Sequence, residues 1–481
     1  MRIVLLIVLV CCSTLLTSAQ ELQLTKGRVL EDLALQDSVG SRMLLYLPTN
    51  FDVARKWPVL FLTTQEGSAS QSLRFMAGAA EREGYILAAN AALLDTLPLT
   101  QKVLYVAGSL DKLKEILPVD TRQIYVGGLR ANAELAQILP SLVQGIRGVL
   151  ALSSAPPNPE LLSLRSSFHY VGVVHRGDHH YLPTVASEIS LREKRIPYYL
   201  RYFESDLELP GEDLIAESLA VLRVMAMKGG HIAQDSAYIR KTYERVLTQV
   251  SVEQKQEAFI VSEALADMGG ELFDDLLPTT GLNAARTAVR RSDGFRSQRR
   301  ELRNLKLKEQ ILSDDFVYYL EEDILRFNLD NLGWWRYQIQ AIEGFKKSDE
   351  HEERLMGKRL HSYIDALIED YETLAFAAKP VDEDALILLG MLRTLSHPTA
   401  SEGYLRVISL TSKYNDYGTA LFYLEELLKT GYRDKQKLYD LEHTALLRIG
   451  PEFNALIEKY LNDPRYEVPE NPDEGGFWPG Y

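Results

Sequence analysis

The densest group of side chains that could do chemistry spans residues 175–180, which read H-R-G-D-H-H. His175, His179 and His180 place imidazoles beside the carboxylate of Asp178. An imidazole and a carboxylate in contact can act as acid and base, and the same groups can bind zinc. Adjacent histidines point in opposite directions in a strand, so a polar loop without metal is the simpler interpretation.

A second chemically informative stretch is the expected strand at residues 123–126, which runs into Gly127-Gly128 and then into helix-favouring residues. A sharp strand-to-helix turn between glycines can expose a nucleophilic serine. Arg130 occupies the central position here. A guanidinium is not a nucleophile and stays protonated at working pH.

Two kinds of region must position these residues. Residues 20–230 alternate short apolar strands with helices, which predicts an α/β domain with a mostly parallel sheet covered on both faces. The expected strands cover residues 42–47, 57–62, 85–89, 123–126, 148–152, 169–174 and 198–203, and the expected helices cover 73–83, 131–139 and 212–227. Residues 231–465 follow a 3.6-residue period, which predicts an all-α region. Its last 90 residues or so have a TPR-like rhythm around residues 414–424.

The N-terminus resembles a secretory signal peptide, with Arg2, an apolar run and small residues before Gln20. Residues 1–19 are therefore expected to be cleaved, and an uncleaved membrane anchor is the alternative. Both cysteines, Cys11 and Cys12, lie in this leader, so the mature chain is expected to lack disulfides and Cys-ligated zinc. No later stretch is apolar and long enough to span a bilayer. The protein is expected to be periplasmic or extracellular.

The overall charge excludes one class of partner. A formal net charge of −14 gives no basis for binding nucleic acid through its phosphates. The most basic run, residues 285–308, is either a solvated helix face or a docking site for an anionic partner. Residues 466–481, rich in Pro, Glu and Gly, are expected to be a disordered tail. Trp334-Trp335 is expected to be core, with a peptide-binding groove as the alternative.

Residues 120–132, DTRQIYVGGLRAN, resemble the pattern D-x-x-R-I-Y-x-x-G-F-S-G-G of exported bacterial esterases and depolymerases with the α/β-hydrolase fold, a group common among Bacteroidetes, some with a helical C-terminal extension. Gly128 matches the first glycine of that family's G-x-S-x-G turn. Arg130 stands at the serine and Asn132 at the second glycine. The resemblance implies an α/β-hydrolase-like domain whose nucleophile is missing.

The other positions implied by the resemblance are also altered. Asp178 matches the acid of the triad. In residues 203–210, FESDLELP, Leu207 stands where the family has its histidine, and leucine cannot accept a proton. In residues 63–68, TTQEGS, Glu66 would oppose the negative charge that an oxyanion loop must stabilise. Three linked losses indicate that Ser-His-Asp chemistry is gone.

The predicted function is therefore a non-catalytic binding or scaffold protein with no cofactor and no metal. Arg130 is expected to lie beside Asp178, either paired with it or holding a small anionic ligand. His179 and His180 complete the candidate binding residues, and the helical region is expected to bind a protein partner. The alternative is an active esterase or peptidase with a site rebuilt around His179 or His180. Its serine would be Ser153, Ser154 or Ser205.

Overall fold

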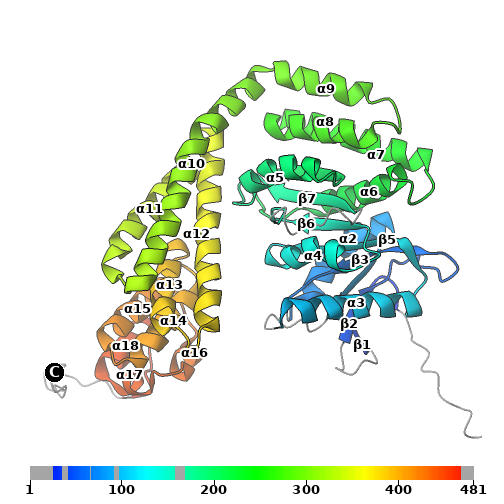
Figure 1. Cartoon of the computed structure of the whole chain (residues 1–481). Coiled ribbons are helices and arrows are strands. Elements are labelled where there is room, and N and C mark those ends of the chain that lie inside the picture. Colours follow the sequence, from blue (N-terminus) through cyan, green and yellow to red (C-terminus); the bar gives the residue numbers. More distant parts are fainter. Residues whose placement is uncertain (1–24, 35–41, 66, 91–96, 158–167, 467–481) are drawn as a thin grey trace, which may run out of the picture.

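Figure 1 shows the computed structural model, which describes residues 25–34, 42–65, 67–90, 97–157 and 168–466. The predicted signal peptide, Glu66 and nearly all of the predicted tail lie outside the described residues. Within those residues no helix combines the length and apolar character needed to cross a bilayer.

The N-terminal part contains one sheet of eight strands. They are β1 (Val29–Ala34), β2 (Arg42–Tyr46), β3 (Trp57–Leu62), β4 (Ile86–Asn90), β5 (Val119–Leu129), β6 (Gly148–Leu152), β7 (His169–His175) and β8 (Tyr198–Phe203). Their order in the sheet is β1-β2-β4-β3-β5-β6-β7-β8, with β2 antiparallel to both neighbours and all pairs from β4 to β8 parallel. This is the strand order of the α/β-hydrolase fold, and it confirms the predicted fold class.

The sheet is buried on both faces, which explains the unbroken apolar runs in the sequence. Every residue of β3, β4, β6 and β7 is buried. The helices between the strands are α2 (Ala69–Glu83), α3 (Leu99–Ile116), α4 (Ala131–Leu142) and α5 (Tyr181–Glu193), and α6 (Glu212–Lys228) follows the last strand. Helix α2 ends where expected, because Gly84 takes the left-handed conformation (φ 71°) that glycine adopts without steric cost.

Three further helices extend the same hydrophobic core. They are α7 (Ser236–Lys255), α8 (Phe259–Phe273) and α9 (Thr280–Arg291). The buried cluster that contains the sheet continues through Val246, Leu265 and Leu282 on these helices. The apolar core thus runs past residue 230, where the sequence analysis placed a domain boundary. That boundary stays a prediction.

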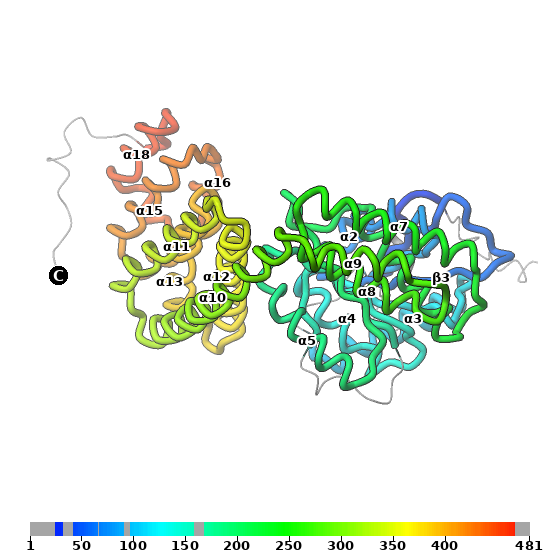
Figure 2. Tube along the Cα trace, turned by 90° about the horizontal axis from the view of Figure 1, so that it is seen from above, coloured from blue at the N-terminus to red at the C-terminus, as the bar shows by residue number. Residues whose placement is uncertain are grey.

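The remaining helices form a second body beside the first (Figure 2). They are α10 (Asp293–Arg326), the short turn η2 (Leu329–Asn331), α11 (Leu332–Lys346), α12 (His351–Ala377), α13 (Glu383–Ser396), α14 (Ser401–Lys413), α15 (Tyr417–Lys429), α16 (Lys435–Asp440), α17 (Ala445–Ile449) and α18 (Pro451–Leu461). Trp335 is buried in this body, and its Nε1 donates a hydrogen bond to Asp323 Oδ2 at 2.8 Å. Trp335 is therefore core. The TPR-like character remains a prediction.

Candidate functional site

The turn between β5 and α4 keeps the strained backbone that would present a nucleophile. Arg130 has φ 54° and ψ −133°, a combination that L-residues rarely adopt. The strand and helix approach so closely that a Cβ on Gly128 would lie 2.5 Å from the carbonyl oxygen of Asn132. Thr63, which follows β3, holds this turn in place because its backbone N–H donates a hydrogen bond to Gly127 O at 2.9 Å. The elbow is therefore formed, with an arginine at its apex.

The side chain of Arg130 is mostly exposed, and its ion-pair partner is Glu208 rather than Asp178. It is 62% exposed, and its Nη2 lies 4.0 Å from Oε2 of Glu208, which is equally exposed. The expected Arg130–Asp178 ion pair is wrong, because the loop after β8 brings Glu208 to the arginine. Leu207, in the same loop, is 76% exposed. No proton acceptor stands at the position that the resemblance gives to histidine.

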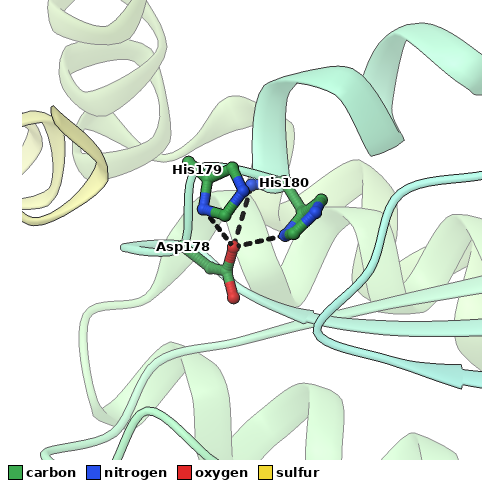
Figure 3. Close-up of side chains that lie close together, drawn as sticks. All are labelled: Asp178, His179 and His180. Carbon is green, nitrogen blue, oxygen red and sulfur yellow. Dashed lines mark hydrogen bonds and ion pairs between the residues drawn. The ribbon is translucent and has the colours of Figure 1, made fainter. Parts of the chain in front are cut away.

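Asp178 instead pairs with its own neighbours in the turn between β7 and α5 (Figure 3). Its Oδ1 accepts hydrogen bonds from the backbone N–H and from Nδ1 of His180, both at 2.9 Å. The Nδ1 of His179 lies 3.4 Å from the same oxygen. Burial opposes ionisation of the carboxyl, but the hydrogen bonds from His180 outweigh it and lower the pKa of Asp178. The turn supplies an ionised carboxylate that holds His180 in place.

His179 joins this turn to the helical body. Its Nδ1 lies 2.9 Å from the hydroxyl of Ser362 on α12, and its ring lies against that of His180 with centroids 3.8 Å apart. Burial, together with the neighbouring His180, lowers the pKa of His179 to about 4. At neutral pH its ring is therefore uncharged. The sequence could not have paired it with a serine on a helix that begins 172 residues later.

His175 braces the two loops that follow β7 and β8. Its Nδ1 accepts from the backbone N–H of Gly177 at 2.9 Å, and its Nε2 lies 3.1 Å from the carbonyl oxygen of Ser205. The backbone N–H of Ser205 lies 3.3 Å from the same Nε2, so backbone groups of both loops hold the imidazole. Both ring nitrogens are used inside the fold. His175 is thus a positioning residue in these loops, although the sequence groups it with the chemical cluster.

The same two loops carry a buried ion network that sequence reasoning missed. Arg176 is 0% exposed and donates to Glu204 Oε1 at 2.6 Å, after β8, and to Glu352 Oε2 at 2.7 Å, on α12. His351 Nε2 lies 2.8 Å from the other oxygen of Glu204. Burial opposes ionisation of Glu204, but its contacts with His351 and Arg176 lower its pKa to about 2.

A second arginine completes the contact between α12 and the loop after β7. Arg359 donates from Nη1 to the carbonyl oxygen of Arg176 at 2.9 Å and makes a two-pronged ion pair with Glu309 of α10, both bonds at 2.7 Å. Glu352, Arg359 and Ser362 are seven and three residues apart, which puts them on one face of α12. That face therefore docks on the loop after β7, and His351 at the start of α12 contacts the loop after β8.

The serines named as possible replacements have other roles. Ser153 is 1% exposed, and its hydroxyl has no hydrogen-bond partner. The hydroxyl of Ser154 accepts from Gln137 Nε2 at 2.9 Å, and that of Ser205 donates to the carbonyl oxygen of Leu207. None of these three hydroxyls is therefore hydrogen-bonded to a histidine.

Part of the basic run at residues 285–308 is paired with acidic neighbours. Arg290 Nε lies 2.6 Å from Oε1 of Glu263, and Arg286 Nη1 lies 2.6 Å from Oδ1 of Asp267. Further along, Lys308 Nζ lies 3.2 Å from Oε1 of Glu353. These pairs occupy some of the positive charges, and the choice between a solvated helix face and an anionic docking site stays a prediction.

Comparisons with known proteins found no matching family model and no matching curated protein. Among solved structures, the chain is similar to EstE1, a carboxylesterase cloned from a metagenomic library (11% identity, 42% of this chain and 90% of that one, TM-score 0.35), and to Est1E from Butyrivibrio proteoclasticus (13%, 41% and 100%, TM-score 0.33). It is also similar to dipeptidyl peptidase 4 from Porphyromonas gingivalis (11%, 39% and 32%, TM-score 0.30), so it spans about a third of that peptidase.

Likenesses this distant carry no argument about activity. The fold assignment rests on the strand order of the sheet and on the helices that follow it. The chain has an N-terminal domain of α/β-hydrolase-like fold followed by an all-helical region.

Proposed function

We propose that the protein is a non-catalytic member of the α/β-hydrolase fold that acts as an exported binding or scaffold protein. One observation carries the proposal: the backbone of the nucleophile elbow is formed, but its apex is Arg130. An arginine cannot be deprotonated at working pH and cannot attack a carbonyl carbon. Leu207 likewise offers no base at the position of the histidine.

The loops of the former triad serve a structural purpose in this proposal. The buried ion pairs of Arg176 and the hydrogen bond from His179 to Ser362 hold α12 against the sheet domain. Separating such a buried ion pair leaves an uncompensated charge away from water, so the pair holds its two partners together. The helical region would thus be presented in a fixed orientation to a protein partner.

The exposed end of the same site keeps a feature suited to binding. The guanidinium of Arg130 is mostly exposed and faces Glu208 only at 4.0 Å, the outer limit of an ion pair. A carboxylate on a small ligand could displace Glu208 and bind the guanidinium through two hydrogen bonds. We propose this position, bordered by His179 and His180, as the ligand end of the scaffold.

The decisive test is turnover of short-chain p-nitrophenyl esters by the purified protein. The expected rate equals that of buffer and does not change in His179→Ala, in His180→Ala or in the control His443→Ala, which removes an exposed histidine elsewhere. Turnover that disappears in His179→Ala or His180→Ala and persists in His443→Ala would refute the non-catalytic proposal.

The second candidate is a hydrolase with a rebuilt site, and the contact between Ser362 and His179 favours it. Its geometry differs from a triad, in which the serine and the acid use different ring nitrogens. Here Ser362 Oγ and Asp178 Oδ1 both approach Nδ1 of His179, at 2.9 and 3.4 Å. Ser362→Ala distinguishes the candidates, because a rebuilt hydrolase would lose its turnover in this variant.

Export rests on the sequence of residues 1–20 and has a simple check. When the gene is expressed in a bacterium with a signal peptidase, the mature protein should begin at Gln20. The intact mass of the protein from the periplasm or the medium measures this. A mass that includes residues 1–19 would favour the membrane-anchor alternative.

A further inference from the structure

A second group of histidines and a carboxylate lies inside the helical region. His361 and Asp365 are one turn apart on α12, and His397 follows the last residue of α13. The Nε2 of His397 lies 2.9 Å from Oδ2 of Asp365, and the Nδ1 of His361 lies 3.5 Å from the same oxygen. The side chains are only 15% (His361), 28% (Asp365) and 41% (His397) exposed.

The hydrogen bonds around this group leave lone pairs facing each other. The Nε2 of His361 lies 3.2 Å from the carbonyl oxygen of Ser396, which can only accept. His361 therefore carries its proton on Nε2, and its Nδ1 lone pair points to the carboxylate of Asp365. Two electron-rich groups at this distance are stabilised by a cation between them. A histidine that donates its second nitrogen to a backbone carbonyl is also the usual arrangement of a metal ligand.

Among the described residues, no lysine or arginine pairs with the Asp365 carboxylate, whose only ion-pair contacts are the two histidines. Oδ1 of Asp365 is buried and has no hydrogen-bond partner. The nearby cations already have partners: Lys346 pairs with Glu343 at 2.6 Å, and Arg393 makes two bonds to Glu372. Glu343 adds a further carboxylate, 3.9 Å from Nε2 of His361.

The cluster at residues 178–180 is a poorer cation site, although its ligand atoms lie equally close together. Oδ1 of Asp178 already accepts two hydrogen bonds from His180, and Nδ1 of His179 contacts the Ser362 hydroxyl. A metal there would have to displace these bonds. In the helical region a metal would displace only the contact between His397 Nε2 and Asp365 Oδ2, because Oδ1 of Asp365 has no hydrogen-bond partner and Nδ1 of His361 lies 3.5 Å from the carboxylate.

We propose that His361 Nδ1, Asp365 Oδ2 and His397 Nε2 bind a divalent transition-metal cation of the zinc class. Two imidazoles and one carboxylate suit Zn²⁺ or Co²⁺ rather than Ca²⁺ or Mg²⁺. Ligands of a tetrahedral zinc at about 2.0 Å lie about 3.3 Å apart, close to the 2.9 and 3.5 Å observed. The cation replaces the proton between His397 and Asp365, and a water or outside ligand fills the fourth position. It ties α12 to the end of α13.

The test is cobalt and zinc binding by the full chain, produced without a polyhistidine tag and freed of metal with a chelator. The visible absorption of Co²⁺ and the heat of Zn²⁺ binding measure affinity and stoichiometry. One metal per chain is expected, with displacement of Co²⁺ by Zn²⁺. His361→Gln, His397→Gln and Asp365→Asn should each weaken binding by at least about tenfold. Asp365→Asn keeps the side-chain shape, so it tests the charge even if a histidine variant folds poorly.

Three control variants decide where the metal binds. His179→Gln and His180→Gln remove histidines of the other cluster, and His443→Gln removes an exposed histidine outside both. All three should bind Zn²⁺ like the parent. Binding that is lost in His179→Gln or His180→Gln but kept in Asp365→Asn would overturn the proposal, as would the absence of saturable binding by a chain whose circular dichroism is that of a folded protein.

Discussion

Two sites at the carboxyl ends of the strands differ in how their side chains are held. At the elbow after β5 the backbone retains its strained form, while the side chain of Arg130 is mostly exposed and contacts Glu208 only at 4.0 Å. In the loops after β7 and β8 the side chains are engaged in a buried network that reaches α12.

The difference shows what holds each part. Tight packing around Gly128 fixes the elbow whatever side chain Arg130 carries, so its chemistry can change without loss of the fold. The loops after β7 and β8 depend on the side chains themselves, because the buried charge of Arg176 needs its carboxylate partners. Changes in the network should therefore cost stability, whereas changes at the apex of the elbow should not.

The largest expected effect is in the network. Arg176→Ala leaves two carboxylates without their buried partner and should lower the free energy of unfolding by about 3–5 kcal/mol. Arg130→Ala, at the exposed arginine, should change it by less than about 0.5 kcal/mol. Urea unfolding followed by circular dichroism measures both. Equal losses in the two variants would remove the distinction between the regions.

Lowering the pH should reduce the free energy of unfolding through groups in the loops after β7 and β8 rather than through the elbow. The pKa of His179 is lowered from 6.5 to about 4, so the unfolded chain binds more protons than the folded chain between these values. Stability therefore falls as pH drops from 6.5 to 4, by at most about 3 kcal/mol from this residue. The lowered pKa of Glu204 adds a further loss between pH 4.5 and 2. Urea midpoints across this range should fall less steeply in His179→Gln and as steeply as the parent in His443→Gln.

Packing at the elbow can be tested with a pair of glycines. Gly128→Ala would place a Cβ 2.5 Å from Asn132 O and should cost about 1–3 kcal/mol. Gly108, inside α3, has nothing within 4 Å of its added Cβ, so Gly108→Ala should raise stability by about 0.5–1 kcal/mol. Thermal unfolding of the two variants shows whether the close approach is real, and a tolerant Gly128 would contradict it.

A modest effect is expected from strain at the apex. Arg130→Gly removes the Cβ from a residue with φ 54° and should stabilise the protein by about 1 kcal/mol. Arg130→Ala keeps the Cβ and the strain, which makes it the matched control. A melting temperature that is the same in both variants would mean that the backbone at residue 130 is not strained.

The sequence predicted the regular elements of the sheet domain well, because their hydrophobic patterns are local. The strand expected at 148–152 is β6, residue for residue, and the helix expected at 212–227 is α6 with one more residue. The strand β1 and the helices α3 and α5 were not predicted. Their apolar residues are interrupted by charged and polar ones, so neither the two-residue period of a strand nor the 3.6-residue period of a helix is clear in the sequence.

The sequence could not reveal the long-range pairs. Nothing local links Arg176 to Glu352 or His179 to Ser362, because those contacts depend on where α12 lies. The Arg130–Asp178 pair failed for the same reason, since the loop after β8 decides which carboxylate reaches the arginine. One pair could be recognised from the sequence, because His361 and Asp365 are four residues apart in a helical pattern and therefore share a face.

A non-catalytic protein should contain no serine that is activated as a nucleophile. Intact-mass measurement after exposure to a fluorophosphonate tests this proposal, because such reagents react with serines that a neighbouring base activates. The mass is expected to be unchanged by the reagent. Addition of one fluorophosphonate group to the parent chain, absent from Ser362→Ala, would contradict it and establish the rebuilt hydrolase.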